Sequence, residues 1–158
     1  MNAAMRMVLS AILATSAAAS SSYVLAMQKC AGASEFTLHG LWPVAESCPG
    51  KPFSDALVKD LLQEMKVDWL SCPEKGGDNE GFWSHEWQKH GTCSGLSEHD
   101  FFAAALELRT QYASLCTTDP CRLQCDGPTG PCAHLVQSDD PASRIFSRIF
   151  LRGGVEIV

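Results

Sequence analysis

The chain has 158 residues, a length typical of one domain, and carries 12 Lys and Arg against 18 Asp and Glu, a formal net charge of −6. Hydrophobic residues make up 46% and charged residues 19%, a balance that excludes a largely disordered protein. The negative charge excludes a protein that binds nucleic acid through a generally basic surface, so any polyanion must bind at a local cluster of positive charge.

Residues 1–19 have the layout of a secretory signal peptide. Arg6 precedes a short apolar run at residues 7–14, and the small residues at 17–19 fit a cleavage site. The apolar run is shorter than the about 20 residues that a membrane span requires. We therefore expect this segment to be removed and the protein to be secreted or vacuolar/lysosomal via the secretory pathway, with no membrane attachment.

The cysteine count agrees with export. An even number of cysteines in an exported chain of this size indicates disulfides. A zinc site is the alternative, but the chain has no Cys-x-x-Cys pair, and no matching His pair follows Cys121 and Cys125. Spacing alone leaves the pairing open for the eight residues Cys30, Cys48, Cys72, Cys93, Cys116, Cys121, Cys125 and Cys132.

Two strands are predicted early in the chain. Residues 23–27 are apolar and β-prone, which is typical of a buried strand. Residues 35–41 alternate between apolar and polar and end at a Trp-Pro pair, so they predict a second strand that buries Phe36 and Leu38.

Three helices are predicted after these strands. Ser54 caps the first, the second covers residues 82–90, and Ser97 caps the third. Beyond residue 116 the pattern ends, and the Gly/Pro-rich segment 121–132 is expected to be irregular and held by disulfides. The side chains expected to face the core from the first and third helices are Leu57, Leu61, Met65, Phe101, Ala105 and Leu108.

The second predicted helix concentrates the reactive side chains. Residues four apart share a face of a helix, so Trp83 and Trp87 are expected to anchor it in the core. Two more pairs on adjoining sides bring a carboxylate, an ammonium and two imidazoles to one flank: Glu86 with His90, and His85 with Lys89.

Zinc catalysis is not expected at this helix. Metalloproteases bind the ion with two His four residues apart, whereas His85 and His90 are five apart and point in different directions. We therefore expect no metal and no cofactor. The alternative for each His taken alone is a satisfied core residue.

Two imidazoles with a carboxylate and an ammonium suit proton transfer at a phosphate. A neutral His can accept a proton while a protonated His donates one, and Lys89 can stabilise developing negative charge. The chain has no Gly-rich phosphate loop and no Ser or Cys nucleophile motif, so the nucleophile is expected in the substrate. RNA supplies a 2′-OH beside each phosphate, and DNA does not.

Two segments resemble the active-site motifs of the ribonuclease T2 family. Residues 36–43, Phe-Thr-Leu-His-Gly-Leu-Trp-Pro, resemble the first motif. Residues 82–93, Phe-Trp-Ser-His-Glu-Trp-Gln-Lys-His-Gly-Thr-Cys, resemble the second. The likeness, closest to plant-type members, covers roughly residues 23–115.

The resemblance implies roles for the polar residues of both motifs. His90 would be the general base that takes the 2′-OH proton, and His39 the general acid that protonates the leaving 5′-oxygen. Glu86 and Lys89 would stabilise the pentacovalent phosphate. His85 would bind the substrate phosphate, with Trp42 packed nearby.

The resemblance implies only part of the base-binding site. Phe82 matches a position where plant members stack a base, and Gln28 is a candidate for a second base-site residue. Val44 stands where fungal members often carry an Asp that reads the base, so the resemblance implies no base preference.

The resemblance also implies an α+β fold, with an antiparallel sheet packed by several helices. Disulfides Cys48–Cys93 and Cys30–Cys72 would tie the loops that carry the motifs. Past residue 115 the chain departs from the family, although residues 121–126 faintly resemble a late strand. We therefore expect a ribonuclease T2-like domain at residues 20–132 whose C-terminal part is shortened, and a divergent tail at residues 133–158.

Together these features predict an endoribonuclease that cleaves single-stranded RNA without a metal, through a 2′,3′-cyclic phosphate to 3′-phosphate ends. DNA would not be a substrate, and a monomer is expected. The alternative is a catalytically weak, secreted ribonuclease-like protein with a binding or storage role.

Overall fold

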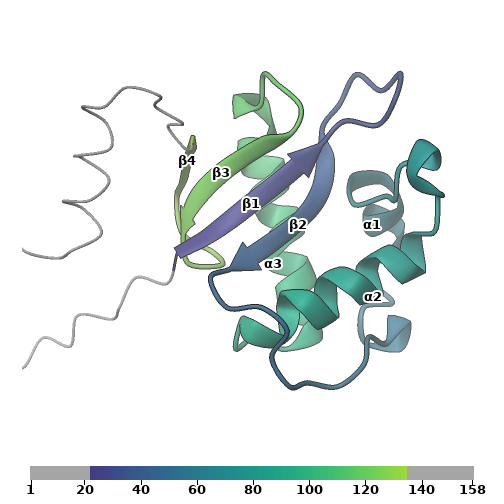
Figure 1. The fold of residues 1–158 in the computed structure, drawn as a ribbon, viewed down its shortest axis with the longest axis vertical. Helices are drawn as coiled ribbons and strands as arrows, with labels where there is room; N and C mark the ends of the chain where they lie inside the picture. Colours follow the sequence, from purple (N-terminus) through teal and green to yellow (C-terminus); the bar gives the residue numbers. More distant parts are fainter. Residues whose placement is uncertain (1–21, 135–158) are drawn as a thin grey trace, which may run out of the picture.

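The structure is a computed structural model that describes residues 22–134 (Figure 1). The expected signal peptide and nearly all of the expected tail lie outside the described residues. Four strands and three α-helices follow one another within this range: β1 (Ser22–Gln28), β2 (Thr37–Pro43), α1 (Leu62–Asp68), α2 (Asn79–Lys89), α3 (Glu98–Tyr112), β3 (Cys121–Asp126) and β4 (Cys132–His134).

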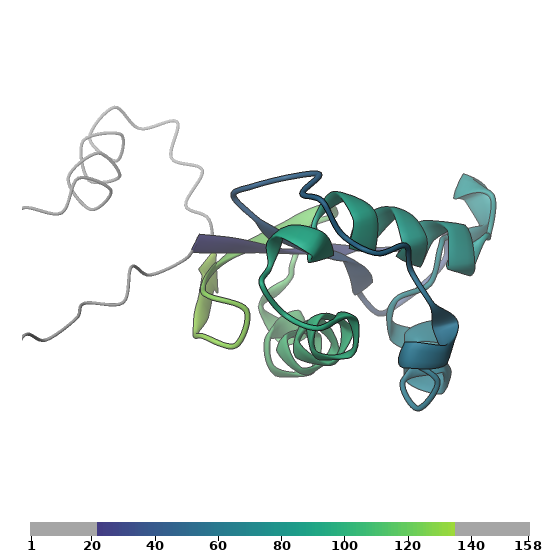
Figure 2. The same ribbon diagram turned by 90° about the horizontal axis from the view of Figure 1, so that it is seen from below.

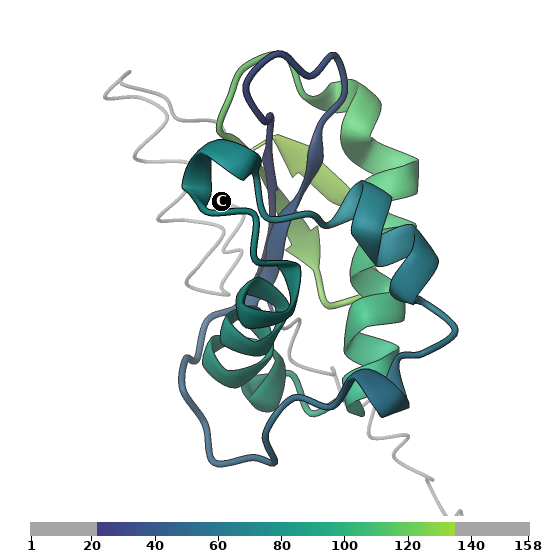
Figure 3. The ribbon, with the colours of Figure 1, turned by 90° about the vertical axis from the view of Figure 1, so that its right-hand side faces the viewer.

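The four strands form one antiparallel sheet in the order β2-β1-β3-β4, which confirms the expected α+β class. Side chains alternate across a strand, and Tyr23, Leu25 and Met27 of β1 all point into the core. Helix α3 packs against this face and lies beneath the sheet in Figure 2. Figure 3 shows the molecule from the side of α1 and α2.

The first predicted helix is wrong in its position. Ser54 caps only a short 3₁₀ helix, Asp55–Leu57, without a side-chain hydrogen bond, and α1 begins at Leu62. Leu57 is exposed rather than buried, whereas Met65 is fully buried. The Ser54 backbone N–H donates instead to the Glu98 carboxylate (2.8 Å), which holds the segment against the start of α3.

The other two helices match the prediction more closely. Helix α2 begins three residues earlier than expected because the Asp78 side chain caps it, accepting a hydrogen bond from the Gly81 N–H (3.0 Å). Trp83 and Trp87 are buried, as expected. The Ser97 hydroxyl accepts a hydrogen bond from the Asp100 N–H (3.1 Å), so the predicted cap of α3 is confirmed.

The expectation of an irregular segment at residues 121–132 is wrong, whereas a strand at residues 121–126, which the family resemblance suggested, is present. Strand β3 pairs with β1 along its whole length, and β4 returns beside it. Cys121, Leu123 and Cys125 alternate into the core, so the segment follows the two-residue period of a strand.

Four disulfides staple this fold. The expected pairs Cys30–Cys72 and Cys48–Cys93 are both present. The remaining pairs, which the spacing left open, are Cys116–Cys121 and Cys125–Cys132. Among residues 22–134, no helix is long and apolar enough to span a membrane.

Candidate active site

A β-bulge in β2 determines where His39 points. Ala26 pairs with Gly40 and Met27 pairs with Leu38, so His39 is the extra residue on β2. Residues three apart in a regular strand point to opposite faces. The bulge instead brings His39 and Trp42 to the same face, with their rings in edge contact at 5.2 Å.

Small and aromatic residues fix the surroundings of His39. The Trp69 indole donates a hydrogen bond to the His39 carbonyl (2.9 Å), which holds the bulged backbone. Gly40 has no side chain, and a Cβ at this position would collide with the Glu86 carboxylate and the Trp42 indole. The absence of a side chain therefore allows α2 to approach β2.

Helix α2 is fixed from its buried side by its two tryptophans. The Trp83 indole donates to the Trp69 carbonyl (2.6 Å), and the Trp87 indole donates to the Lys51 carbonyl (2.9 Å). With this face in the core, the neighbouring side of the helix presents Glu86 to β2.

Trp42, Glu86 and the two imidazoles form the centre of the site. The Trp42 Nε1–H donates to Glu86 Oε2 (2.8 Å), and Glu86 Oε1 lies 3.7 Å from His39 Nε2. The Trp42 ring also stacks on the His90 ring, with 5.2 Å between centroids and 26° between planes. The structure therefore brings His39, Trp42, Glu86 and His90 together.

Burial controls the charge of Glu86. The residue is 1% exposed, and this burial raises its pKa to about 7, although the Trp42 hydrogen bond and the Lys89 charge favour the ionised form. At a mildly acidic pH the carboxyl therefore keeps its proton and can act as a hydrogen-bond donor.

The two imidazoles are both biased towards the neutral form. Burial lowers the pKa of His90 to about 4, and the charges of Lys89, His85 and His39 act in the same direction. The buried Nδ1 of His90 has no hydrogen-bond partner among the described residues, and Glu46 Oε1 lies 3.9 Å away. Burial also lowers the pKa of His39, with Lys75 as the largest charge contribution.

The candidate base-binding residues lie beside His39. The Phe82 ring contacts the His39 ring edge-on at 5.5 Å. Gln28 is 3% exposed, and its Oε1 accepts a hydrogen bond from Lys75 Nζ (2.8 Å). A cavity of about 330 Å³ joins them near the beginning of α2, and its lining residues are Gln28, His39, Ser71, Cys72, Lys75, Asp78 and Phe82.

His85 and Lys89 lie further along α2, on its exposed side. Both border a second cavity of about 590 Å³, which the loop at residues 47–52 encloses from the opposite side. The Ser47 N–H donates to the Lys89 carbonyl (2.6 Å), and the Cys48–Cys93 disulfide holds the same loop to the segment after α2. The site thus has one cavity near each end of α2.

Three charged residues of the site were not predicted from the sequence. Lys75 follows Cys72 in a 3₁₀ helix, Glu46 lies in the loop after β2, and Arg122 reaches the Trp42 ring from β3 (5.4 Å from Cζ to the ring centroid). No periodicity links these positions to the two motifs, so only the fold brings them together. His99, in contrast, pairs with Asp60 (3.0 Å) on an exposed surface and does not join the site.

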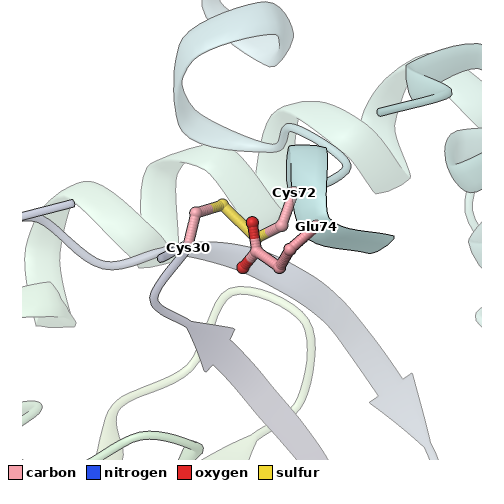
Figure 4. A group of neighbouring side chains, drawn as sticks. All are labelled: Cys30, Cys72 and Glu74. Carbon is pink, nitrogen blue, oxygen red and sulfur yellow. A yellow bond between two sulfur atoms is a disulfide. The ribbon is translucent and has the colours of Figure 1, made fainter. Parts of the chain in front are cut away.

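One group of potential metal ligands occurs in the described residues, and it does not suit a metal. Figure 4 shows Cys30, Cys72 and Glu74, whose candidate ligand atoms lie within 4.8 Å of one another. The two sulfurs form a disulfide and offer no thiolate, and the Glu74 carboxylate accepts a hydrogen bond from the Ala31 N–H (2.9 Å). This group fastens the loop after β1 rather than forming a metal centre.

Known proteins share both the sequence motifs and this fold. The sequence model of the ribonuclease T2 family matches residues 14–119. Ribonuclease 1 of Arabidopsis thaliana is 43% identical over 88 residues, which cover 49% of this chain and 37% of that protein. Extracellular ribonuclease LE of Solanum lycopersicum is 36% identical over 107 residues, which cover 60% of this chain and 46% of that protein.

Solved structures agree with the sequence matches. Ribonuclease MC1 from bitter gourd seeds is 31% identical with a TM-score of 0.55, and the match covers 59% of each chain. Human RNase T2 is 30% identical with a TM-score of 0.53, and the match covers 58% of this chain and 56% of that one. The chain thus spans less than half the length of the two curated plant relatives. On the family match, the motifs and the shared fold, the chain belongs to the ribonuclease T2 family.

Proposed function

We propose that the chain is an endoribonuclease that cleaves single-stranded RNA by metal-independent transesterification, through a 2′,3′-cyclic phosphate to 3′-phosphate ends. The observation that carries this proposal is that two imidazoles, His39 and His90, both contact the Trp42 indole, which also donates a hydrogen bond to the buried Glu86 beside His39. Two proton-transfer groups around one small space suit an in-line exchange at phosphorus.

His90 serves as the general base and His39 as the general acid. The 2′-oxygen attacks phosphorus as His90 takes its proton, and the P–O5′ bond breaks as His39 gives a proton to the 5′-oxygen. The lowered pKa of His90 supports the basic role because the ring stays neutral even in mild acid. In the second step the two His exchange roles: His39 takes a proton from a water molecule that attacks phosphorus, the P–O2′ bond breaks, and His90 gives its proton to the 2′-oxygen, which leaves a 3′-phosphate.

Glu86 and Lys89 stabilise the crowded phosphorus intermediate. The raised pKa of Glu86 supports this role, because a protonated carboxyl can donate to a phosphoryl oxygen where a carboxylate would repel it. Lys89 supplies positive charge from the next turn of α2, and His85 binds the substrate phosphate at the same rim. Trp42 orients Glu86 through its indole N–H.

The cavity beside His39 receives a base. The Phe82 ring stacks on it, and the Gln28 amide, which Lys75 holds in one orientation, offers polar contacts to its edge. The second cavity, next to His85 and Lys89, has room for the nucleotide on the other side of the scissile phosphate. DNA lacks the 2′-OH and would not react.

The cellular setting follows from the sequence and the family. Residues 1–19 act as a signal peptide and direct a monomeric enzyme into the secretory pathway, outside the cell or to the vacuole or lysosome. The disulfides support this setting because they persist in oxidising compartments.

An RNA digestion assay in EDTA tests the proposal. We expect cleavage to persist with the chelator and a 2′,3′-cyclic phosphate to precede the 3′-phosphate. His39→Ala and His90→Ala should each reduce the rate by at least about a hundredfold, as for loss of a general acid or base. Intact RNA after incubation with a folded sample would refute the enzyme and favour a binding or storage role instead.

A further inference from the structure

We propose that Arg122 is a substrate-positioning residue that binds an RNA phosphate next to the scissile one, an inference that rests on the proposed ribonuclease function. Arg122 lies on β3, outside both sequence motifs, and pairs with Ala26 of the central strand. Its side chain extends across that strand towards β2, where the guanidinium lies 5.4 Å from the centre of the Trp42 ring.

Trp42 links Arg122 to the reacting groups. The same indole contacts His39 at 5.2 Å and His90 at 5.2 Å, so a single ring separates the guanidinium from each imidazole. The charge of Arg122 also acts to lower the pKa of His39, second among the charges after that of Lys75. Arg122 has no hydrogen bond or ion pair with His39, Glu86 or His90 among the described residues, so we assign it to the neighbouring phosphate in the RNA chain rather than to the scissile one.

The hydrogen-bonding capacity of Arg122 is unused within the described residues. Arg109, the other arginine in this range, donates to the Phe36 carbonyl (2.9 and 3.2 Å) and to Asp68 (2.9 Å). Arg122 is exposed and forms no such ion pair with a residue in the 22–134 range, and its one described contact is the Trp42 ring. A guanidinium with free N–H groups matches a phosphate, which it can bind with two hydrogen bonds.

The negative overall charge of the chain makes each local cation important for RNA binding. A protein with a formal net charge of −6 repels RNA except where cations gather. Lys75 and Lys89 lie on the two cavities beside α2, and Arg122 adds a third cation on the sheet side of Trp42. The charges of all three act on His39.

The first experiment compares substrates with and without a flanking phosphate. The kcat/KM of wild type, Arg122→Gln and Arg122→Lys is measured on a dinucleoside monophosphate and on a single-stranded oligonucleotide. We expect Arg122→Gln to lose about two- to fivefold more on the oligonucleotide, chiefly through KM, as for one exposed charge contact. Arg122→Lys, which keeps the charge, should lose less. Equal losses on the two substrates would overturn the inference.

The second experiment measures binding without cleavage. A 2′-O-methyl oligonucleotide cannot react, and its affinity is followed over a range of salt concentrations. Arg122→Gln should lower the slope of log affinity against log salt by about 0.7, the value for one phosphate contact in a single strand. Lys66→Gln removes the same charge from the exposed side of α1 and should leave the slope unchanged.

The two experiments separate the inference from the proposed function. An Arg122→Gln slope equal to that of wild type would overturn the role of Arg122 even if the enzyme cleaves RNA. Binding with the expected slope change but without cleavage would overturn only the ribonuclease activity.

Discussion

The Trp42 indole donates a hydrogen bond to the buried Glu86 carboxyl at 2.8 Å, which joins the end of β2 to the middle of α2. This bond is one of several contacts that join the two sequence motifs. Its donor ring also contacts both imidazoles, so the orientation of one side chain affects every proposed proton transfer.

Trp42→Phe should test this connection. The variant keeps most of the ring but loses the N–H, so Glu86 becomes unrestrained and its pKa rises further. We expect kcat to fall by about tenfold, and the free energy of unfolding to fall by about 1 kcal/mol, the usual net value of one hydrogen bond. Tyr23→Phe, which loses a hydrogen bond to the Ser94 carbonyl outside the site, should lower stability without this loss of kcat.

The rate should depend on pH with a maximum in mild acid. A neutral His90 is required, so the rate rises as pH increases through its pKa of about 4. A protonated His39 is also required, so the rate falls as pH increases through a pKa below 6.5. The two limbs of kcat/KM belong to the coupled pair. A profile that is flat from pH 4 to 8 would contradict these roles.

Lys75 should set the position of the alkaline limb. Its charge is the largest of those that lower the pKa of His39, so Lys75→Met should move that limb upward by a few tenths of a pH unit. Lys75→Arg keeps the charge and should leave the limb near its wild-type position. An unchanged limb in Lys75→Met would show that the Lys75 charge does not reach His39.

Glu86 should make the fold less stable as pH rises. Burial raises its pKa from 4.5 to about 7, so between these values the folded chain retains a proton that the unfolded chain has lost. The stability contributed by the neutral carboxyl is complete below pH 4.5 and is lost as pH rises towards 7. Glu86→Gln does not titrate, so its stability relative to wild type should increase across this window by up to about 3 kcal/mol.

Urea unfolding at several pH values measures this difference. His90 has the opposite dependence: its pKa is lowered from 6.5 to about 4, so its contribution is complete above pH 6.5 and is lost as pH falls through 4. Because both proteins contain His90, the comparison isolates Glu86. A difference that stays constant with pH would contradict the raised pKa.

The Cys48–Cys93 disulfide should matter more than Cys125–Cys132. The first joins residues 45 apart in sequence and the second residues 7 apart. In the chain-entropy description, replacing the first pair by Ala costs about 4 kcal/mol and the second about 2 kcal/mol. Denaturant unfolding checks the order. Loss of Cys48–Cys93 should also reduce activity, because it frees the loop that borders His85 and Lys89.

The local sequence predicts the parts of this fold that rest on local rules. Ser97 caps α3 with its own hydroxyl, and Trp83 and Trp87 bury one face of α2, since both features depend on residues within one or two turns. The alternation of Cys121, Leu123 and Cys125 is also present in the sequence, but the Gly and Pro residues that follow it favour an irregular segment. Pairing with β1, from the other end of the chain, makes this segment a strand.

The site is predictable in its residues but not in its full environment. The motifs name His39, Glu86 and His90, yet the shifted pKa values come from burial that only the folded chain produces. Lys75 and Arg122 lie outside both motifs, and their effect on the site depends on tertiary contacts.

The bulge at His39 is a one-residue irregularity in an otherwise regular ladder. Deleting one residue of β2 at this point would give regular backbone pairing. It would also turn either the His39 imidazole or the Trp42 indole into the interior. A variant designed only for regular backbone pairing would adopt that shortening and would lose its chemistry. Engineered variants with a redesigned β2 should therefore keep the bulge at His39.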